Sequence, residues 1–274
     1  MEPAEPMARL VVPSRCAHGE GVLWCERRAL VLWVDIYGSR LWMHAPASGV
    51  SRCWVLPDRP CCMALATDGS LLLALAKSLQ RADLDAALRG HGELPLRHLA
   101  DVQADEPRTR SNDGRADRHG NFVFGTMDES ADKSAIGTFY QYSARHGLRL
   151  LPLPPSAIPN SICFSPDGRT LYWCDSIQPV ILACDYDPDA AQVAPSRQFA
   201  RVDLDGAAPD GSCIDAEGAL WNAQWGGARV VRYRADGSTD CIVPMPVPQP
   251  SCCAIGGEAL DTLYVITSPQ GLDA

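Results

Sequence analysis

The sequence of 274 residues has no long apolar run and no secretion signal that can be recognised. Its longest apolar run, residues 71–76, has the length of a strand, whereas a membrane helix needs about 20 apolar residues. The first nine residues are polar and lack the apolar core of a signal peptide. We therefore expect a cytoplasmic protein that has no membrane partner.

The chain also has fewer basic than acidic residues. The chain has 24 Lys and Arg against 33 Asp and Glu, a formal net charge of -9, and the basic residues form no run or stripe. A nucleic acid or an anionic membrane is therefore not an expected partner. Apolar residues make up 46% and charged residues 21%, which is the balance of a globular protein with a buried core.

Several compact catalytic and metal-binding motifs are missing. The twelve cysteines include no C-x-x-C pair, and the six histidines show neither H-x-H nor H-E-x-x-H spacing. There is no G-x-S-x-G elbow and no phosphate-binding loop. These absences argue against a thiolate or histidine zinc site and a serine hydrolase of that class. We interpret most of the cysteines as small buried apolar residues in a reducing compartment.

A repeated unit organises the chain. A turn, usually Asp, Glu or His followed by Gly, precedes an apolar strand that starts at residue 30, 71, 122, 171, 220 or 263. The intervals of 41, 51, 49, 49 and 43 residues match the spacing of four-stranded propeller blades. Helical patterns are scarce, with one short turn expected at residues 83–90. The pattern predicts an all-β fold, a six-bladed β-propeller formed by residues 1–274 as a single domain.

The last blade looks incomplete. Residues 8–12 could supply an N-terminal closing strand, but only residues 268–274 follow the apolar strand at 263–267. The other repeats carry a further strand after the corresponding point. We therefore expect the last blade to be short of a C-terminal strand.

A site on a propeller axis draws single residues from several blades, so isolated polar residues just before the apolar strands are the candidates. Glu20 lies between two glycines, Asn160 follows a proline, and Asp210 is part of Pro-Asp-Gly. Each has an ordinary alternative role as a turn residue.

The segment 110–115 is denser in polar groups. Arg110, Asn112 and Asp113 place a guanidinium, an amide and a carboxylate close together, a set that suits the hydroxyl and carbonyl acceptors of a sugar. The alternative is an exposed loop with a surface ion pair.

At these residues the sequence resembles the senescence marker protein–gluconolactonase family, also called regucalcin-like. The resemblance runs from about residue 19 to 268. The sequence is also similar to the bacterial sugar lactonases of pentose catabolism. The matching segments are Gly-Glu-Gly-x-x-Trp at 19–24, Trp-Val-Asp at 33–35, Arg-x-Asn-Asp-Gly at 110–114, Phe-Gly-Thr-Met at 124–127, Pro-Asn-Ser-Ile-x-Phe-Ser-Pro-Asp-Gly at 159–168, Pro-Asp-Gly at 209–211 and Trp-Gly-Gly at 225–227.

The resemblance implies a six-bladed propeller with one divalent cation in its channel. Glu20, Asn160 and Asp210 are then the metal ligands. Arg110 and Asn112 are substrate-binding residues, together with Glu129, for which the neighbouring Asp128 is a rival. Carboxylate and amide oxygens suit Ca, Mg, Mn or Fe(II), with Zn also possible.

The implied activity is metal-dependent hydrolysis of aldonolactones such as glucono-, xylono- or arabinonolactone, with Asp210 or another channel carboxylate as the base. Two other hypotheses remain open: a non-catalytic calcium-binding propeller, and a propeller esterase in which His18 assists. His18 itself is interpreted as structural. The expected partner is the small-molecule sugar lactone, and the expected state is a monomer or weak oligomer.

Overall fold

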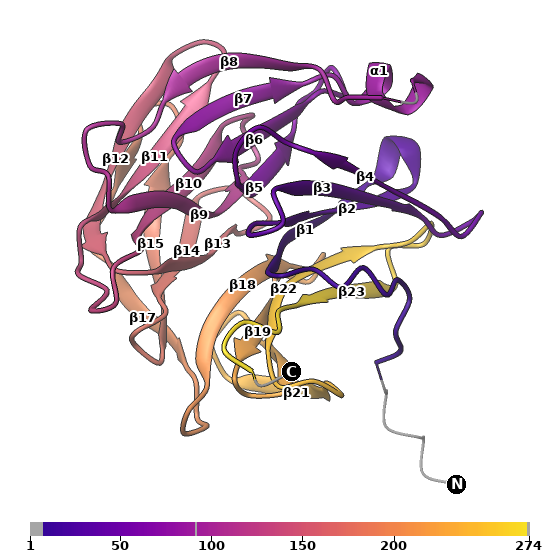
Figure 1. Ribbon diagram of the computed structural model, residues 1–274. Coiled ribbons are helices and arrows are strands. Elements are labelled where there is room, and N and C mark those ends of the chain that lie inside the picture. Colours follow the sequence, from indigo (N-terminus) through magenta and orange to yellow (C-terminus); the bar gives the residue numbers. More distant parts are fainter. Residues whose placement is uncertain (1–7, 91, 273–274) are drawn as a thin grey trace, which may run out of the picture.

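The computed structural model describes residues 8–90 and 92–272. The chain forms an all-β propeller whose antiparallel sheets follow one another around a central axis (Figure 1). The first three sheets are meanders of four strands. They are β1 (Gly19–Cys25), β2 (Leu30–Asp35), β3 (Arg40–Ala45) and β4 (Val50–Val55); β5 (Pro60–Leu65), β6 (Leu71–Leu75), β7 (Ser78–Ala82) and β8 (Leu96–Asp101); and β9 (Thr109–Ala116), β10 (Phe122–Asp128), β11 (Gly137–Ser143) and β12 (Gly147–Ser156).

The remaining sheets differ in size. The fourth has five strands because both β16 and β17 pair with β15, the fifth has four, and the sixth has two. They are β13 (Pro159–Phe164), β14 (Thr170–Asp175), β15 (Val180–Asp187), β16 (Gln192–Val193) and β17 (Arg197–Arg201); β18 (Ala208–Ile214), β19 (Leu220–Trp225), β20 (Arg229–Tyr233) and β21 (Thr239–Pro244); and β22 (Pro250–Gly256) and β23 (Thr262–Thr267).

The predicted repeat is the second strand of each sheet, namely β2, β6, β10, β14, β19 and β23. The turn before such a strand contains a residue in the left-handed region, which is glycine in most repeats, as Gly69 at φ +87 and Gly120 at φ +89, and Ala29 at φ +51 before β2. The aspartate of the turn accepts backbone hydrogen bonds, for example Asp167 from the amide of Arg169 at 3.0 Å. These features confirm the repeat as strands preceded by tight turns.

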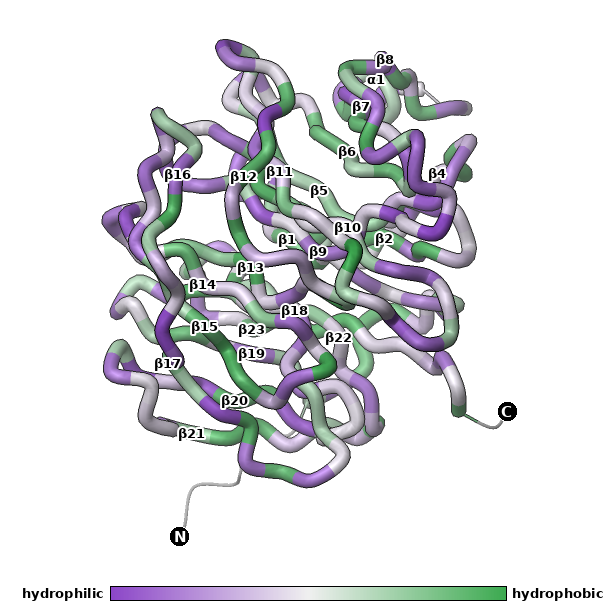
Figure 2. The backbone as a smooth tube through the Cα atoms, turned by 90° about the vertical axis from the view of Figure 1, so that its left-hand side faces the viewer, coloured by the Kyte–Doolittle hydropathy of each residue, from purple (hydrophilic) through white to green (hydrophobic). Residues whose placement is uncertain are grey.

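Apolar side chains fill the spaces between neighbouring sheets. Six buried clusters each join two successive sheets, including one that joins the sixth sheet to the first through Val22, Trp33 and Cys252. Figure 2 shows apolar residues along the strands and polar residues on many of the connecting turns. The first and last sheets therefore lie side by side and complete the ring (Figure 1).

The prediction of six blades is not confirmed, because five sheets have four or more strands and the sixth has only two. The closing strand expected at residues 8–12 does not form. Instead, Val12 and Cys16 pack against the cluster between the sixth and first sheets. That apolar packing holds this segment without strand pairing.

Two short helical elements lie outside the sheets: a 3-10 turn, η1 (Glu26–Arg28), and a single helix, α1 (Leu84–Arg89). Asp83 caps α1 by accepting a hydrogen bond from the amide of Ala86 at 2.9 Å, which confirms the helical turn predicted there. Within residues 8–90 and 92–272, no helix is long and apolar enough to cross a membrane.

Candidate functional site

The first strand of each sheet lines the axis, and these strands, β1, β5, β9, β13, β18 and β22, contact one another in a ring. These strands begin at one end of the axis, and we call this end the mouth. Each of them pairs with the second strand of its sheet through a register shift near the mouth. Such a β-bulge redirects side chains. Glu20, Asn160 and Asp210, the predicted metal ligands, all lie at these bulges.

The backbone at two of the bulges takes a left-handed conformation. Gly21, after Glu20, has φ +57, and Ser161, after Asn160, has φ +61. A non-glycine residue rarely adopts this region, and such strain concentrates at functional sites. The hydroxyl of Ser161 is buried and lies 2.5 Å from that of Ser212, a contact that helps to hold the bulge.

Glu20 and Asp210 are buried carboxylates that repel each other. Their exposed fractions are 7% and 5%, and neither forms an ion pair with another described residue. Burial, with a contribution from Asp113, raises the pKa of Glu20 from 4.5 to about 8. Burial and the charge of Glu20 raise the pKa of Asp210 well above its usual value. The site therefore gathers acidic groups that no described cation pairs with by direct contact.

A chain of hydrogen bonds joins the predicted substrate-binding residues to the predicted ligands. Arg110 Nη1 donates to Asn112 Oδ1 at 2.7 Å, and Asn112 Nδ2 donates to Asn160 Oδ1 at 3.1 Å. Asn160 Nδ2 then donates to Ser176 Oγ at 2.8 Å, and Ser176 Oγ donates to the carbonyl of Pro209 at 2.7 Å. Arg110 and Asn112 are buried in β9, so the alternative of an exposed surface loop is wrong. The sequence carried no signal for Ser176.

Asp113 is a further buried carboxylate below the ligands. Its Oδ2 accepts a hydrogen bond from the amide of Ile162 at 2.8 Å, and burial raises its pKa although Arg115 opposes the shift. Its charge also contributes to the raised pKa values of Glu20 and Asp210. Asp113 belongs to a motif noted in the sequence, but only the folded structure shows that it lies close to the predicted metal ligands.

Glu129 lies between two arginines at the mouth. Its carboxylate accepts hydrogen bonds from both Nη atoms of Arg59, at 2.6 and 2.8 Å, and lies 3.5 Å from Nε of Arg110. Although burial opposes the shift, the bonds from Arg59 lower the pKa of Glu129 below its usual value. Sequence reasoning missed Arg59, because nothing in the surrounding residues marks it. The structure brings Glu129 to Arg110.

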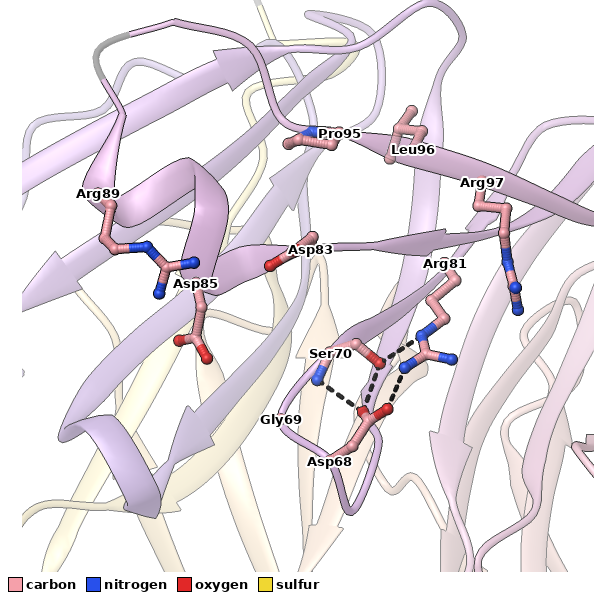
Figure 3. Close-up of a pocket in the computed structure, with 10 residues that line it drawn as sticks. All are labelled: Asp68, Gly69, Ser70, Arg81, Asp83, Asp85, Arg89, Pro95, Leu96 and Arg97. Carbon is pink, nitrogen blue, oxygen red and sulfur yellow. Dashed lines mark hydrogen bonds and ion pairs between the residues drawn. The ribbon is translucent and has the colours of Figure 1, made fainter.

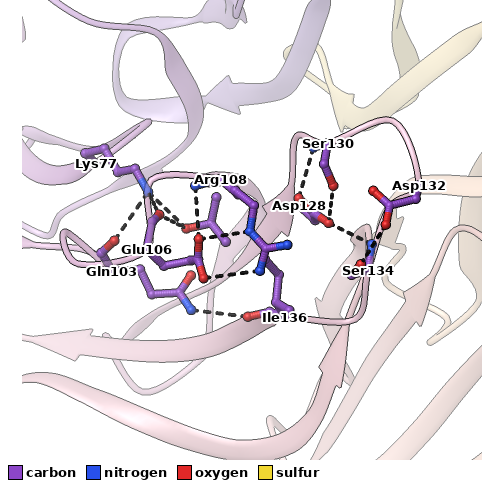
Figure 4. A network of polar contacts seen from close by, with 10 residues as sticks. Lys77, Gln103, Glu106, Arg108, Asp128, Ser130, Asp132, Ser134 and Ile136 are labelled. Carbon is purple, nitrogen blue, oxygen red and sulfur yellow. Dashed lines mark hydrogen bonds and ion pairs between the residues drawn. The ribbon is translucent and has the colours of Figure 1, made fainter.

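Asp128, the rival of Glu129, has a local role. Its carboxylate accepts from the amide and hydroxyl of Ser130 and the amide of Ser134, which ties the loop after β10 (Figure 4). Nearby, Lys77 Nζ donates to the Glu106 carbonyl at 2.6 Å and to Thr109 Oγ1 at 3.0 Å. These contacts fix the segments that lead to Glu129 and into β9.

Aromatic rings form one side of the mouth. The ring of His18 lies 5.3 Å from that of Tyr37 and 5.6 Å from that of Trp225, and the Arg110 guanidinium lies 5.9 Å from the Tyr37 ring. His18 is buried, and its Nδ1 lies 2.7 Å from the hydroxyl of Ser268. Burial and the charge of Arg110 lower the pKa of His18 to about 3, so the ring is neutral.

Two surface pockets lie outside the set of predicted site residues. The larger, about 570 Å³, is lined by Asp68, Arg81, Asp83 and α1 residues (Figure 3). Its Arg81 is already paired with Asp68. A second pocket, about 390 Å³, borders Ser176 and the loop at 201–207. The first contains none of the predicted site residues.

The residues on the axis fit a hard divalent cation. Within the described ranges, no three His, Cys, Asp or Glu side chains form a metal-binding group, so a three-ligand site here depends on the amide oxygen of Asn160. That oxygen accepts one hydrogen bond and has a second lone pair. A cation beside Glu20 and Asp210 would also relieve the repulsion that raises their pKa values.

Comparison with known proteins gives matches over nearly the whole chain. A family model described as SMP-30/Gluconolactonase/LRE-like region matches residues 18–269. The L-arabinolactonase of Azospirillum brasilense is 44% identical over 267 residues, which cover 97% of this chain and 85% of that protein. The 6-deoxy-6-sulfogluconolactonase of Pseudomonas putida is 31% identical over 268 residues, with coverages of 97% and 88%.

Among solved structures, a calcium-binding protein, regucalcin, from Agrobacterium tumefaciens str. C58 superimposes with a TM-score of 0.88 at 30% identity. The match covers 98% of this chain and 88% of that one. The fold of nearly the whole chain is therefore shared with that protein.

Proposed function

The chain belongs to the SMP-30/gluconolactonase/LRE-like family, and from this premise we infer that it is an enzyme that hydrolyses sugar lactones. The observation that carries the inference is the 44% identity with an L-arabinolactonase over 97% of the chain. The buried polar residues at the mouth are the candidate active site for this reaction, since carboxylates, amides and a guanidinium lie together there.

We propose that the preferred substrate is a five-carbon aldonolactone of the L-arabinonolactone type. The support is the name and identity of the relative from Azospirillum brasilense. Glucono- and xylonolactone are the other aldonolactones to compare, and another named relative acts on a six-carbon sulfo-sugar lactone.

We further propose that Glu20, Asn160 and Asp210 hold one divalent cation, of the class Ca, Mg, Mn, Fe(II) or Zn. Two carboxylates and an amide oxygen are donors that such ions accept. When bound, a cation of this kind polarises a carbonyl group and stabilises negative charge on its oxygen. The calcium-binding structural relative supports the presence of a cation.

The residues of the chain then have separate roles. Arg110 and Asn112 orient the sugar ring by hydrogen bonds to its hydroxyl or ring oxygens, and Glu129 fixes the guanidinium of Arg110. A carboxylate oxygen of Asp210 takes one proton from the attacking water as its oxygen bonds to the carbonyl carbon. The bond from that carbon to the ring oxygen then breaks, and the proton passes to the leaving oxygen, which gives the aldonic acid.

We also propose that the two-stranded sheet is a shortened sixth blade of one propeller domain. In support, β22 contacts both β18 and β1, and apolar clusters join this sheet to both neighbours. The twelve free cysteines support a reducing compartment such as the cytoplasm. A monomeric or weakly associated state stays a prediction.

The test is proton release from a panel of fresh pentono- and hexonolactones, followed with a pH indicator. Protein treated with a chelator is assayed alone and after addition of single metals. Restored hydrolysis that is fastest with arabinonolactone supports the proposal. A folded protein that binds calcium and hydrolyses no lactone would instead support the non-catalytic calcium-binding propeller.

A further inference from the structure

His18 and Glu20 face the same side of the chain at the mouth. They are two residues apart, and the backbone ladder already includes position 18, because its carbonyl accepts from the amide of Ile36 at 2.9 Å. Side chains two residues apart on a strand share a face. Since β1 runs inward from the mouth, His18 lies on the outer side of Glu20. A ligand whose reacting group meets Glu20 therefore has its other end near His18.

The hydrogen bonds around Ser268 orient the imidazole. The buried Ser268 hydroxyl accepts from the amide of Gln270 at 3.1 Å, and among the described residues the acceptor for its own hydrogen is His18 Nδ1 at 2.7 Å. We assign the ring hydrogen of His18 to Nε2 on this basis. No described residue accepts a hydrogen bond from Nε2, so this atom is a donor available to a ligand.

The flanking rings differ in exposure. Tyr37 is 43% exposed although it adjoins the buried His18 and Arg110, and Trp225 is half-buried. Nε of Arg110 is buried and has no hydrogen-bond partner, although the carboxylate of Glu129 lies 3.5 Å away. Exposed aromatic faces beside an underused donor suit a ligand with both C–H faces and hydroxyl groups, as a sugar ring has.

We propose that His18, Tyr37 and Trp225 form an aromatic wall that binds the end of the lactone ring away from its carbonyl group. Nε2 of His18 donates to a ring hydroxyl, and Tyr37 packs against the C–H face. These are substrate-binding residues, and Ser268 is a positioning residue that acts through His18. The inference rests on the proposed function, because it takes the lactone carbonyl to lie at Glu20.

The experiment compares wild type with H18F, which keeps a ring and loses the donor, and with Y37A, which removes an exposed ring. Values of kcat and KM are measured with arabinonolactone. In parallel, binding of 1,4-anhydroarabinitol, the same ring without the carbonyl oxygen, is followed by tryptophan fluorescence of the metal-loaded protein. H98F is the matched control, because His98 lies on β8 with its side chain 54% exposed.

We expect KM and the dissociation constant of the anhydro sugar to rise together in both variants, by about threefold to tenfold, while kcat changes less than about twofold. H98F should match wild type. If H18F does not fold, Y37A carries the test, since its side chain is largely exposed. Unchanged KM and unchanged binding in Y37A and in any folded H18F would overturn the wall.

The two proposals fail in different ways. If wild type hydrolyses lactones and the variants keep its KM and its affinity for the anhydro sugar, the proposed role of the aromatic wall is wrong and the proposed lactonase activity is supported. If wild type hydrolyses no lactone but binds the anhydro sugar in a way that H18F and Y37A weaken, the reaction is wrong and the wall is supported.

Discussion

At the scale of single residues, the centre of the site is defined by charge that the protein leaves unbalanced. Glu20 and Asp210 are both nearly fully buried, and each raises the cost of ionising the other. A buried carboxylate without a partner destabilises a fold, so such a pair is retained where it serves a function. The cation proposed there would offset the repulsion and use the same oxygens for the reaction.

The first prediction concerns Glu20→Gln and Asp210→Asn. Each substitution keeps the side-chain shape and removes one negative charge, so the fold should remain while metal affinity falls. We expect kcat/KM for arabinonolactone to fall by about a hundredfold or more. Steady-state kinetics at saturating metal, with circular dichroism to verify folding, measures this. Wild-type activity in either variant would remove that residue from the site.

The second prediction concerns the stability of the metal-free protein against pH. Its folded state holds a proton on Glu20 up to about pH 8, whereas the unfolded chain releases that proton near 4.5. Through Glu20, the free energy of unfolding should therefore decrease as the pH rises from about 4.5 to about 8, and Asp210 acts in the same direction. The lowered pKa of His18 opposes this trend below about pH 6.5, so the decrease is clearest between pH 6.5 and 8.

Urea unfolding of chelator-treated protein across that pH range measures the slope, and Glu20→Gln should flatten it. Saturating metal should reverse the trend, because metal binding requires deprotonated ligands. A metal-free protein that becomes more stable between pH 6.5 and 8, where His18 no longer titrates in either state, would contradict the raised pKa values.

At the scale of elements, the inner strands approach one another too closely for ordinary side chains at some positions. Gly211, beside Asp210 on β18, faces β22 so closely that an added Cβ would lie 2.9 Å from Cα of Cys252 and 2.6 Å from its Sγ. The backbone there must yield, because the obstacle includes main chain. This contact sets how β18 presents Asp210 to the axis.

The third prediction is that Gly211→Ala lowers the free energy of unfolding by about 1–3 kcal/mol and reduces activity more than stability alone explains. Gly92→Ala is the matched control, since an added Cβ there meets nothing within 4 Å. Urea midpoints and kcat/KM of the two variants test this. If both variants have the same urea midpoint and the same kcat/KM, β18 and β22 can move apart without loss of stability or activity.

At the scale of the whole molecule, the ring closes through apolar contacts between the sixth and first sheets. Trp24 on β1 and Tyr264 on β23 stack with ring centres 5.8 Å apart and planes 12° from parallel. Because the sixth sheet has two strands, it offers fewer side chains for this closure than a four-stranded sheet would. Each stacked ring at this junction therefore matters more to the closed form.

The fourth prediction is that Tyr264→Ala destabilises the protein by about 2 kcal/mol, since it removes a half-buried ring from the junction. Hydrogen exchange should also quicken in β1 and β22 before it does in the third sheet. Urea unfolding and exchange mass spectrometry measure these effects. Wild-type stability in this variant would indicate that the junction between the sixth and first sheets is stabilised mainly by other contacts, such as those of Val12 and Cys16.

The sequence by itself determined the strands and the chemical types of the site. Apolar strands after tight turns, four of which are Asp-Gly, Glu-Gly or His-Gly, are local patterns that local backbone preferences are enough to fix, and all six predicted strands are present. The motif around Arg110 and Asn112 also identified its residues, because their polar groups lie within one strand. The N-terminal segment was misjudged, since apolar packing and strand pairing of residues 8–12 look alike in sequence, whereas the shortage of strands after residue 267 could be read from the sequence.

Only the tertiary structure decided which distant residues meet. Ser176, Arg59 and Tyr37 carry no local signal, and each gains its place from a contact between sheets. The pKa values of Glu20 and Asp210 likewise depend on burial and on each other, which the ring of inner strands creates. Local sequence sets strand and turn, but desolvation and charge repulsion are properties of distance in space, and only the closed propeller fixes those distances.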